Sequence, residues 1–321
     1  MKRFSNILVL VDDESRSEAL LERARRMAQV TGAALTLIDV IDSSPTTLSR
    51  VIGSVRELRV QNLESDIAAC HQERLDELAA PLLAGGLPVE TKVLFGVGFI
   101  ETIQHVLRHG NDLVMKAAHG TPGLSILAGP DLHLLRNCPC PVWILNDTNG
   151  ASSRRIMAAV EPDPEDDIRD QLCHSVMEVA AFLSNQDAAK LDVVTAWSLP
   201  EETMLRGARF NMSRDEIEAI LRTVELESSS RLQALVRDFE AFSDRIRVVH
   251  MKGVPADVVA EHAETEQIDT LVIGILGKPN DAGLLIGNTA VTIMNRVRCS
   301  ILAVKPPGFV SPVTLERLAA S

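Results

Sequence analysis

The residues best suited to chemistry lie near the end of the chain, where small residues are spaced for contact with an anion. Gly274 and Gly277 are separated by two residues, and nine further residues lead to Gly287, Asn288 and Thr289. Glycines let backbone amides approach a ligand closely, and the free amides and dipole at a helix start favour an anion such as phosphate. The preceding apolar run predicts a buried strand, and parallel sheets place ligands beyond the carboxyl ends of their strands. The spacing therefore predicts an anion-binding loop.

An acidic residue follows the first apolar run in each half of the chain. Asp12 ends the run that starts at Ile7, and Glu161 ends the run that starts at Ile156. The next predicted strand of the second half contains Ala196 close to its end. Each acid therefore stands at the predicted carboxyl end of a buried strand.

The first half shows a weaker version of the same loop. Lys116 and His119 have the spacing of the two glycines, so side chains stand where Gly274 and Gly277 stand in the second half. Gly129 matches the third glycine but is followed by Pro130, which has no amide donor. These residues predict a degenerate loop in the first half.

The elements that would position these residues repeat along the chain. Apolar runs that predict strands alternate with segments of helical periodicity, and the whole series occurs twice. Gly32 is a predicted helix end, and Ser213 with Glu216 has the spacing of a capping box. The predicted strands fall at residues 7–11, 35–40, 89–94, 112–115 and 141–145, and again at 156–160, 191–197, 246–250, 269–273 and 300–304.

This alternation predicts an α/β fold with two tandem, doubly wound domains, each a five-stranded parallel sheet with helices on both faces. The polar stretch from Asn146 to Ser153 is typical of a linker. We therefore expect a first domain at residues 1–147, with the degenerate loop, and a second at residues 152–321, with the intact loop.

Composition limits the classes of function. The formal net charge of −12 repels phosphate backbones, so nucleic acid is not an expected partner. No tract is long and apolar enough for a membrane span, which predicts a soluble protein without membrane insertion. The five scattered cysteines fit a reducing compartment, and we expect a cytoplasmic location. No group of residues has the spacing of a metal site.

These motifs together resemble the universal stress protein family. The resemblance is carried by the glycine loop from Gly274 to Thr289, by the strand-ending acids, by Gly253-Val254-Pro255 and by the run from Asn137 to Val142. It covers essentially the whole chain and is strongest with the tandem, E-like branch of the family. It implies Rossmann-like domains of the adenine nucleotide alpha hydrolase-like type.

What the resemblance implies for function is a non-catalytic, nucleotide-binding stress-response protein. The expected ligand is ATP with Mg²⁺, or another nucleotide or phosphorylated ligand, held by the second domain. Its predicted contacts are Gly274, Gly277, Gly287, Asn288 and Thr289 at the phosphates, with Glu161 and Ala196 at the base or sugar. No catalytic residue is predicted. The chain differs from the family's pattern at two of these residues. Asn288 stands where the family has Ser or Thr, and Glu161 stands where it has Asp, so both differences affect the expected nucleotide contacts.

Two other functions stay open from the sequence. A carrier or sensor of an apolar, lipid-like ligand would use pockets between the long helices and the sheet, and a weak ATPase would need a metal and a positioned water. The two domains are expected to pair within the chain, as family dimers do, and the chain is expected to form a homodimer.

Overall fold

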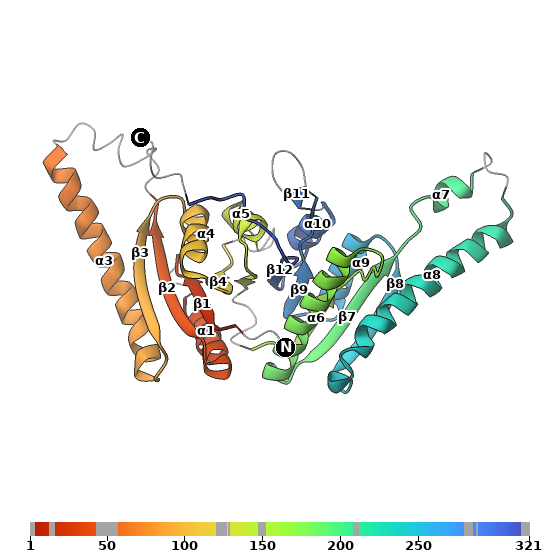
Figure 1. Ribbon diagram of the computed structural model, residues 1–321, viewed down its shortest axis with the longest axis horizontal. Helices are drawn as coiled ribbons and strands as arrows, with labels where there is room; N and C mark the ends of the chain where they lie inside the picture. Colours follow the sequence, from red (N-terminus) through yellow and green to blue (C-terminus); the bar gives the residue numbers. More distant parts are fainter. Residues whose placement is uncertain are drawn as a thin grey trace. The chain divides into compact units, whose positions relative to one another are not determined.

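A computed structural model of the protein describes residues 4–12, 17–42, 57–119, 127, 129–146, 152–207, 212–278, 285–286 and 288–315. They belong to two compact units. We call residues 4–152 together with residues 309–315 the first unit, and residues 153–308 the second unit. In each unit, strands form a sheet on which helices pack (Figure 1).

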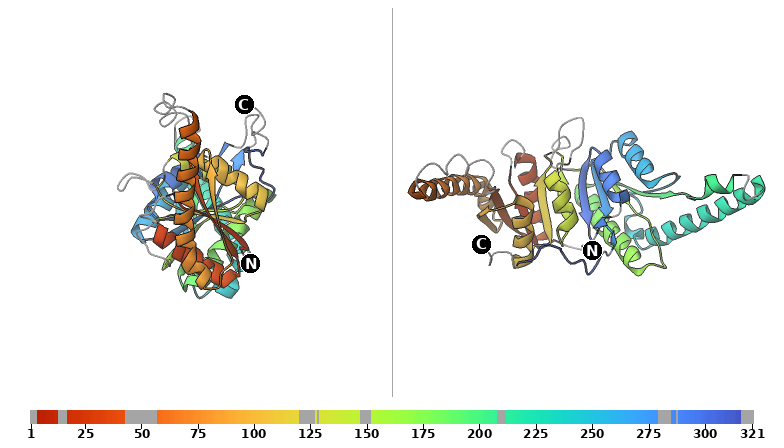
Figure 2. Two further views of the ribbon diagram at one scale, coloured as in Figure 1. Left: turned by 90° about the vertical axis from the view of Figure 1, so that its left-hand side faces the viewer. Right: turned by 90° about the horizontal axis from the view of Figure 1, so that it is seen from above.

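The first unit is a parallel sheet of five strands in the order β3-β2-β1-β4-β5. Right-handed crossovers in this order place α1 and α3 on one face of the sheet and α4 and α5 on the other, and Figure 2 shows helices on both sides. The elements are β1 (Asn6–Leu10), α1 (Ser17–Thr31), β2 (Ala34–Ile41), α3 (Glu57–Ala84), β3 (Val89–Phe95), α4 (Gly98–His109), β4 (Leu113–Ala117), α5 (Gly129–Asn137) and β5 (Val142–Leu145).

The second unit repeats this plan, with parallel strands in the order β12-β9-β6-β7-β8. Its elements are β6 (Arg155–Ala159), α6 (Asp167–Asp187), β7 (Lys190–Trp197), α7 (Glu202–Leu205), α8 (Arg214–Arg237), η3 (Glu240–Phe242), β8 (Ile246–Lys252), α9 (Pro255–Thr265), β9 (Thr270–Gly274), β10 (Gly277–Lys278), β11 (Leu285–Ile286), α10 (Asn288–Arg296) and β12 (Ser300–Val304). The predicted fold class, two tandem doubly wound α/β domains with parallel sheets, is confirmed.

Local sequence signals explain where several helices begin and end. The Ser213 hydroxyl accepts a hydrogen bond from the amide of Glu216, whose carboxylate accepts one from the amide of Ser213, so the predicted capping box starts α8. Gly32 has a φ of +73° and donates its amide to Ala28, as expected for the residue after a helix. The Asp166 carboxylate accepts hydrogen bonds from the amides of Ile168 and Arg169, which starts α6.

The two sheets are buried on both faces, which explains their near-continuous apolar strands. In β4 and β9, which have a neighbouring strand on each side, almost every residue is buried. The edge strands β3 and β8 are more exposed and carry charged residues such as Lys92 and Arg247. The core of each unit thus lies along its middle strands.

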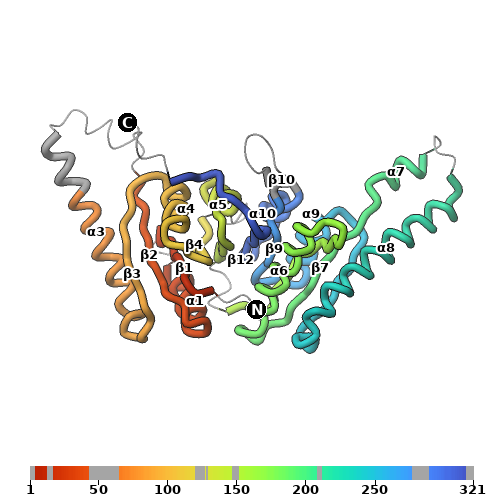
Figure 3. The backbone as a smooth tube through the Cα atoms, viewed as in Figure 1, coloured from red at the N-terminus to blue at the C-terminus, as the bar shows by residue number. Residues whose placement is uncertain are grey.

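The end of the chain belongs to the first unit. After β12 the chain leaves the second unit, and residues 309–315 join the first unit, against α4 (Figure 3). The side-chain amide of the buried Gln104 in α4 donates to the carbonyl oxygen of Thr314 at 3.1 Å, and Ser311 is buried. The compact second unit therefore ends at residue 308. The second domain predicted from the sequence runs to residue 321.

Candidate functional site

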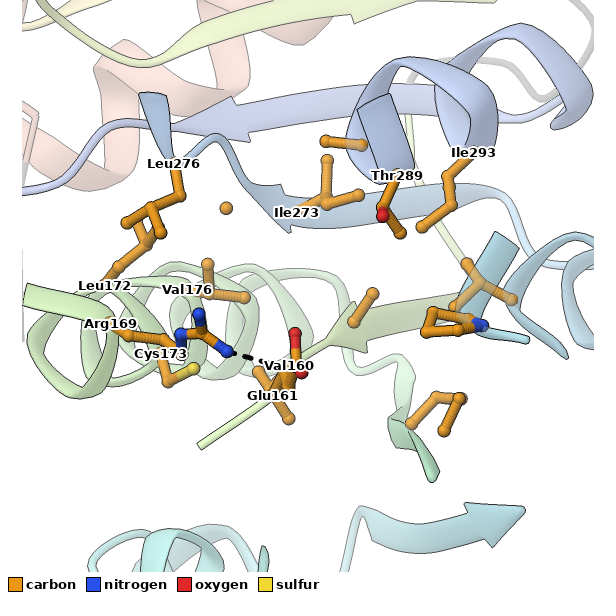
Figure 4. Close-up of a pocket in the computed structure, with 17 residues that line it drawn as sticks. Val160, Glu161, Arg169, Leu172, Cys173, Val176, Ile273, Leu276, Thr289 and Ile293 are labelled. Carbon is orange, nitrogen blue, oxygen red and sulfur yellow. Dashed lines mark ion pairs between the residues drawn. The ribbon is translucent and has the colours of Figure 1, made fainter. Parts of the chain in front are cut away.

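The second unit contains a cavity of about 290 Å³ at the carboxyl edge of its sheet. It opens where β6 and β9 lie side by side. The strands β7 and β8 follow on one side of β6, whereas β9 and β12 lie on its other side, so the order of the strands reverses at this point. In doubly wound folds this crevice is the usual ligand site. The walls are formed by α6 on one side and by α9 and α10 on the other (Figure 4).

Most of the cavity wall is apolar, so the interior suits a flat or aliphatic group. Val160, which follows β6, lines it together with Val194 and Ile273 from the strands. Val176, Val259 and Ile293 line it from the three helices. Cys173 also lines the cavity, and burial raises the pKa of its thiol to about 11. The thiol is therefore protonated at neutral pH and is a poor nucleophile.

An ion pair lies at the cavity. The Arg169 guanidinium in α6 lies 3.4 Å from the Glu161 carboxylate, which follows β6 (Figure 4). The Glu161 side chain is 71% exposed and that of Arg169 is 34% exposed, so water screens the pair and its contribution to stability is small. The pair places an acceptor, on Glu161, and a donor fork, on Arg169, at the cavity.

Gly274 lies at the end of β9, where α6 comes close to the backbone. A Cβ atom at this position would lie 2.8 Å from two carbon atoms of the Leu172 side chain. The residue therefore has to be small for Leu172 to take its place in the cavity wall. This is a packing reason for glycine, and it differs from the phosphate contact that the sequence predicts.

Four of the seven predicted contacts line the cavity: Glu161, Ala196, Gly274 and Thr289. Thr289 is exposed in the first turn of α10, and Asn288 is the first residue of that helix. Gly277 is the first residue of β10 and pairs with Ile286 of β11. Gly287 lies outside the described residues. The predicted loop thus contains a short antiparallel strand pair that the sequence did not indicate.

Sequence reasoning missed the wall that α6 contributes. Arg169, Leu172 and Cys173 line the cavity but are not among the residues predicted for the site. The signal was present, because α6 starts soon after Glu161 and its first turns therefore lie at the carboxyl edge. Pro255 and Val259 of α9 line the cavity for the same reason, since α9 follows the edge strand β8 directly.

The strand registers correct the predicted match between the two loops. Leu10 of β1 pairs with Lys116, and Ala159 of β6 pairs with Ile273. The amide of Ala118 donates to the carbonyl oxygen of Leu145 in β5. The amide of Ile275 donates to the carbonyl oxygen of Val304 in β12, which is the equivalent strand. Lys116 therefore corresponds to Ile273 and His119 to Leu276, one position before each glycine, and the residue that corresponds to Gly274 is Ala117.

In the first unit the corresponding place holds charged side chains. The Lys116 ammonium lies 2.7 Å from the Asp131 carboxylate and 3.0 Å from the Asp12 carboxylate. The His119 ring contacts the Lys116 ammonium and lies 3.2 Å from the second oxygen of Asp12. Burial raises the pKa of Asp12, although Lys116 and His119 act in the opposite direction. We call these four residues the internal ion cluster.

The described residues limit the chemistry in two respects. They include no cluster of three or more His, Cys, Asp or Glu side chains arranged to hold a metal ion. Among the same residues, no helix combines the length and apolar character that a membrane span requires. A Mg²⁺ ion at the cavity would need ligands from the bound molecule itself, because Glu161 carries the one carboxylate among the described residues that line it.

Comparison with known proteins agrees with the fold and its repetition. A model described as the universal stress protein family matches residues 3–146 and again residues 153–305. Universal stress protein E of Escherichia coli strain K12 is 27% identical over an alignment of 325 positions, which covers 98% of this chain and 98% of that protein. A universal stress protein E homolog of Haemophilus influenzae is 26% identical, over 95% of this chain and 98% of that protein.

A solved structure covers both units. The crystal structure of a universal stress protein from Archaeoglobus fulgidus superposes with a TM-score of 0.63, at 15% identity, over 94% of this chain and 96% of that one. At this identity the match shows the fold alone. The family model, which covers most of the chain in two copies, shows that the protein belongs to the universal stress protein family, a family of stress-response proteins, and is a tandem member of it.

Proposed function

We propose that the second unit binds a nucleotide of the ATP type in the cavity between α6, α9 and α10, and that the protein acts in the stress response through this ligand without catalysing a reaction. The observation that carries the proposal is the position of the cavity. It lies at the point where the crossovers change direction, beside a strand-ending carboxylate and the start of α10.

Each part of a nucleotide has a suitable neighbour in this cavity. The apolar walls around Val160 and Val194 suit the flat faces of a base. The Glu161 carboxylate is an acceptor for ribose hydroxyls, at the strand end where open α/β sheets bind their ligands. Thr289 and the free amides of the first turn of α10 are donors for phosphate oxygens.

The first test is to identify what the purified protein holds. Mass spectrometry of small molecules released by denaturation should detect ATP or ADP, and calorimetric titration with ATP, with and without Mg²⁺, should give saturable binding. Absence of a nucleotide from the released molecules, together with no binding heat at several temperatures, would contradict the proposal. Phosphate release that requires Mg²⁺ would instead favour the weak ATPase.

A matched pair of variants tests the position of the site. Ala196→Phe places a ring in the cavity wall, and we expect at least tenfold weaker ATP binding because the cavity is small. Val40→Phe is the control, since Val40 occupies the same register position in β2 as Ala196 in β7 and is equally half-buried. Unchanged binding in Ala196→Phe, or equal loss in both variants, would exclude the cavity as the ATP site.

The apolar lining favours one second candidate, a carrier or sensor of an apolar ligand. Leu172, Val176 and Ile293 offer contacts to an aliphatic chain as readily as to a base. In that case the molecule released from the purified protein would be lipid-like. Ala196→Phe would abolish its recovery, and added ATP would not change the amount recovered. The same mass spectrum therefore separates the two candidates.

We also propose that the protein acts in the cytoplasm as a homodimer. The acidic composition and the scattered free thiols support an intracellular place of action. Light scattering of the purified chain at several concentrations measures the oligomeric state, and a mass of about one chain at all concentrations would contradict the dimer.

A further inference from the structure

The internal ion cluster of the first unit occupies the place that the cavity occupies in the second unit. Leu10 of β1 and Ala159 of β6 occupy the same position in the pairing with the next strand of their unit. Asp12 therefore corresponds to Glu161, because each follows two residues later. The pairing of β4 and β9 matches Lys116 with Ile273 and His119 with Leu276. Asp131 is the third residue of α5 and Ala290 is the third residue of α10, and both helices have nine residues.

Every one of these counterparts lines the cavity of the second unit. Two apolar side chains and one methyl group have therefore been replaced by a lysine, a histidine and an aspartate. The Lys116 ammonium connects α5 to the end of β1, because it reaches both Asp131 and Asp12. In the second unit, the corresponding space between Ile273, Ala290 and Glu161 is part of the cavity.

The cluster resists displacement because its central pair, Lys116 and Asp131, is buried. Asp131 is completely buried and Lys116 is 4% exposed. A ligand that separated them would leave two charges without partners in an apolar place, which is far more costly than moving an apolar side chain. Larger side chains add to the obstruction, since Leu10 and Val40 correspond to Ala159 and Ala196.

We infer that Asp12, Lys116, His119 and Asp131 close the first unit to ligands, so that the chain binds one ligand per two domains. The residues that decide between a closed and an open unit are Lys116, His119 and Asp131, and not the loop glycines. The statement that the chain binds one ligand rests on the proposed function. The statement that the first unit is closed and the second unit is open does not depend on the proposed function.

Exchange of the three residues between the units tests the inference. The first variant is Lys116→Ile with His119→Leu and Asp131→Ala, which should open the first unit. The reciprocal variant is Ile273→Lys with Leu276→His and Ala290→Asp, which should close the second unit because Glu161 remains available to the lysine. The substitutions in each variant are made together so that neither Lys116 nor Asp131 is left buried without the other.

Xenon is the probe, because it enters apolar cavities regardless of the physiological ligand. In crystals of the full-length wild-type chain under xenon pressure, we expect xenon beside Val160 in the second unit and none beside Lys116. The first variant should hold xenon in both units, and the reciprocal variant in neither. Circular dichroism and cooperative urea unfolding check that each variant is folded.

Three results would overturn the inference: xenon in the first unit of the wild type, a folded first variant without xenon there, or a folded reciprocal variant that still holds xenon in the second unit. The wild-type measurement decides the matter even where a variant does not fold. Titration with ATP then separates this inference from the proposed function. If xenon binds as expected but ATP does not bind, the inference about the cluster stands and only the proposed nucleotide site is excluded. Two ATP sites per chain in the first variant would support both the inference and the proposed function.

Discussion

At the scale of single residues, Lys116 is the charge on which the first unit most depends. It is a buried cation between two carboxylates, and its removal would leave Asp12 and Asp131 facing one another. We predict that Lys116→Met lowers the free energy of unfolding by about 3–5 kcal/mol, as expected for breaking a buried ion pair. Adding Asp131→Ala should restore much of this loss.

Urea unfolding of the two variants measures the effect. Lys190→Met is the control, since Lys190 is an exposed lysine at the start of β7 and its loss should change stability by less than about 0.5 kcal/mol. A Lys116→Met variant as stable as Lys190→Met would show that water reaches the cluster and compensates for the missing ammonium.

Residue-level comparison also shows how far spacing alone can mislead. Lys116 and His119 are three positions apart, as Gly274 and Gly277 are, and this equal spacing produced the wrong match. The strand registers place both residues one position earlier in the repeat. A slip of one residue moves side chains to the opposite face of a strand, so only the pairing of neighbouring strands could correct it.

At the scale of elements, His174 connects two helical segments of the second unit. One ring nitrogen of this α6 residue lies 3.0 Å from the Asp238 carboxylate just after α8, and the other lies 3.0 Å from the Asp170 carbonyl oxygen. Burial lowers the pKa of His174, but these hydrogen bonds and the carboxylates of Asp170 and Asp238 outweigh it, so the pKa is raised.

A raised histidine pKa stabilises the fold at acidic pH. The contribution is complete below the unfolded value of about 6.5 and is lost as the pH rises through the higher folded value. We predict that this connection makes the urea midpoint fall between pH 6 and pH 8, and that Asp238→Asn reduces the fall. Asp244→Asn, at a carboxylate that is 76% exposed, should leave the slope as it is. Equal slopes in all three proteins would exclude the role of His174.

Most elements could be predicted because their signals are local. Strands such as β4 and β9 are continuous apolar runs, and α8 begins with a capping box, so pattern and capping chemistry suffice. The pair β10 and β11 could not be predicted, since each has two residues. The α6 wall of the cavity was missed because its residues are ordinary helix residues, and only the arrangement of α6 beside β9 makes them part of a site.

At the scale of the whole molecule, the first unit depends on a segment from the far end of the chain. We predict that ending the chain after Gly308 speeds hydrogen exchange in α4, because the buried Gln104 amide loses its acceptor at Thr314. The amides of β6 and β9 should keep their protection. Thr314→Ala is the matched control, since it retains the carbonyl oxygen. Unchanged exchange in α4 after truncation would show that residues 309–315 do not stabilise it.

The return of the chain to the first unit has a consequence for biosynthesis. A ribosome completes residue 152 and must then make the 156 residues from 153 to 308 before residue 309 is added, which takes about 8–30 s at ordinary rates of elongation. The domain that is synthesised first is thus the domain that is finished last. A chain broken off anywhere within the second unit carries an incomplete first unit, so interrupted products differ in stability from the finished protein and are open to selective proteolysis.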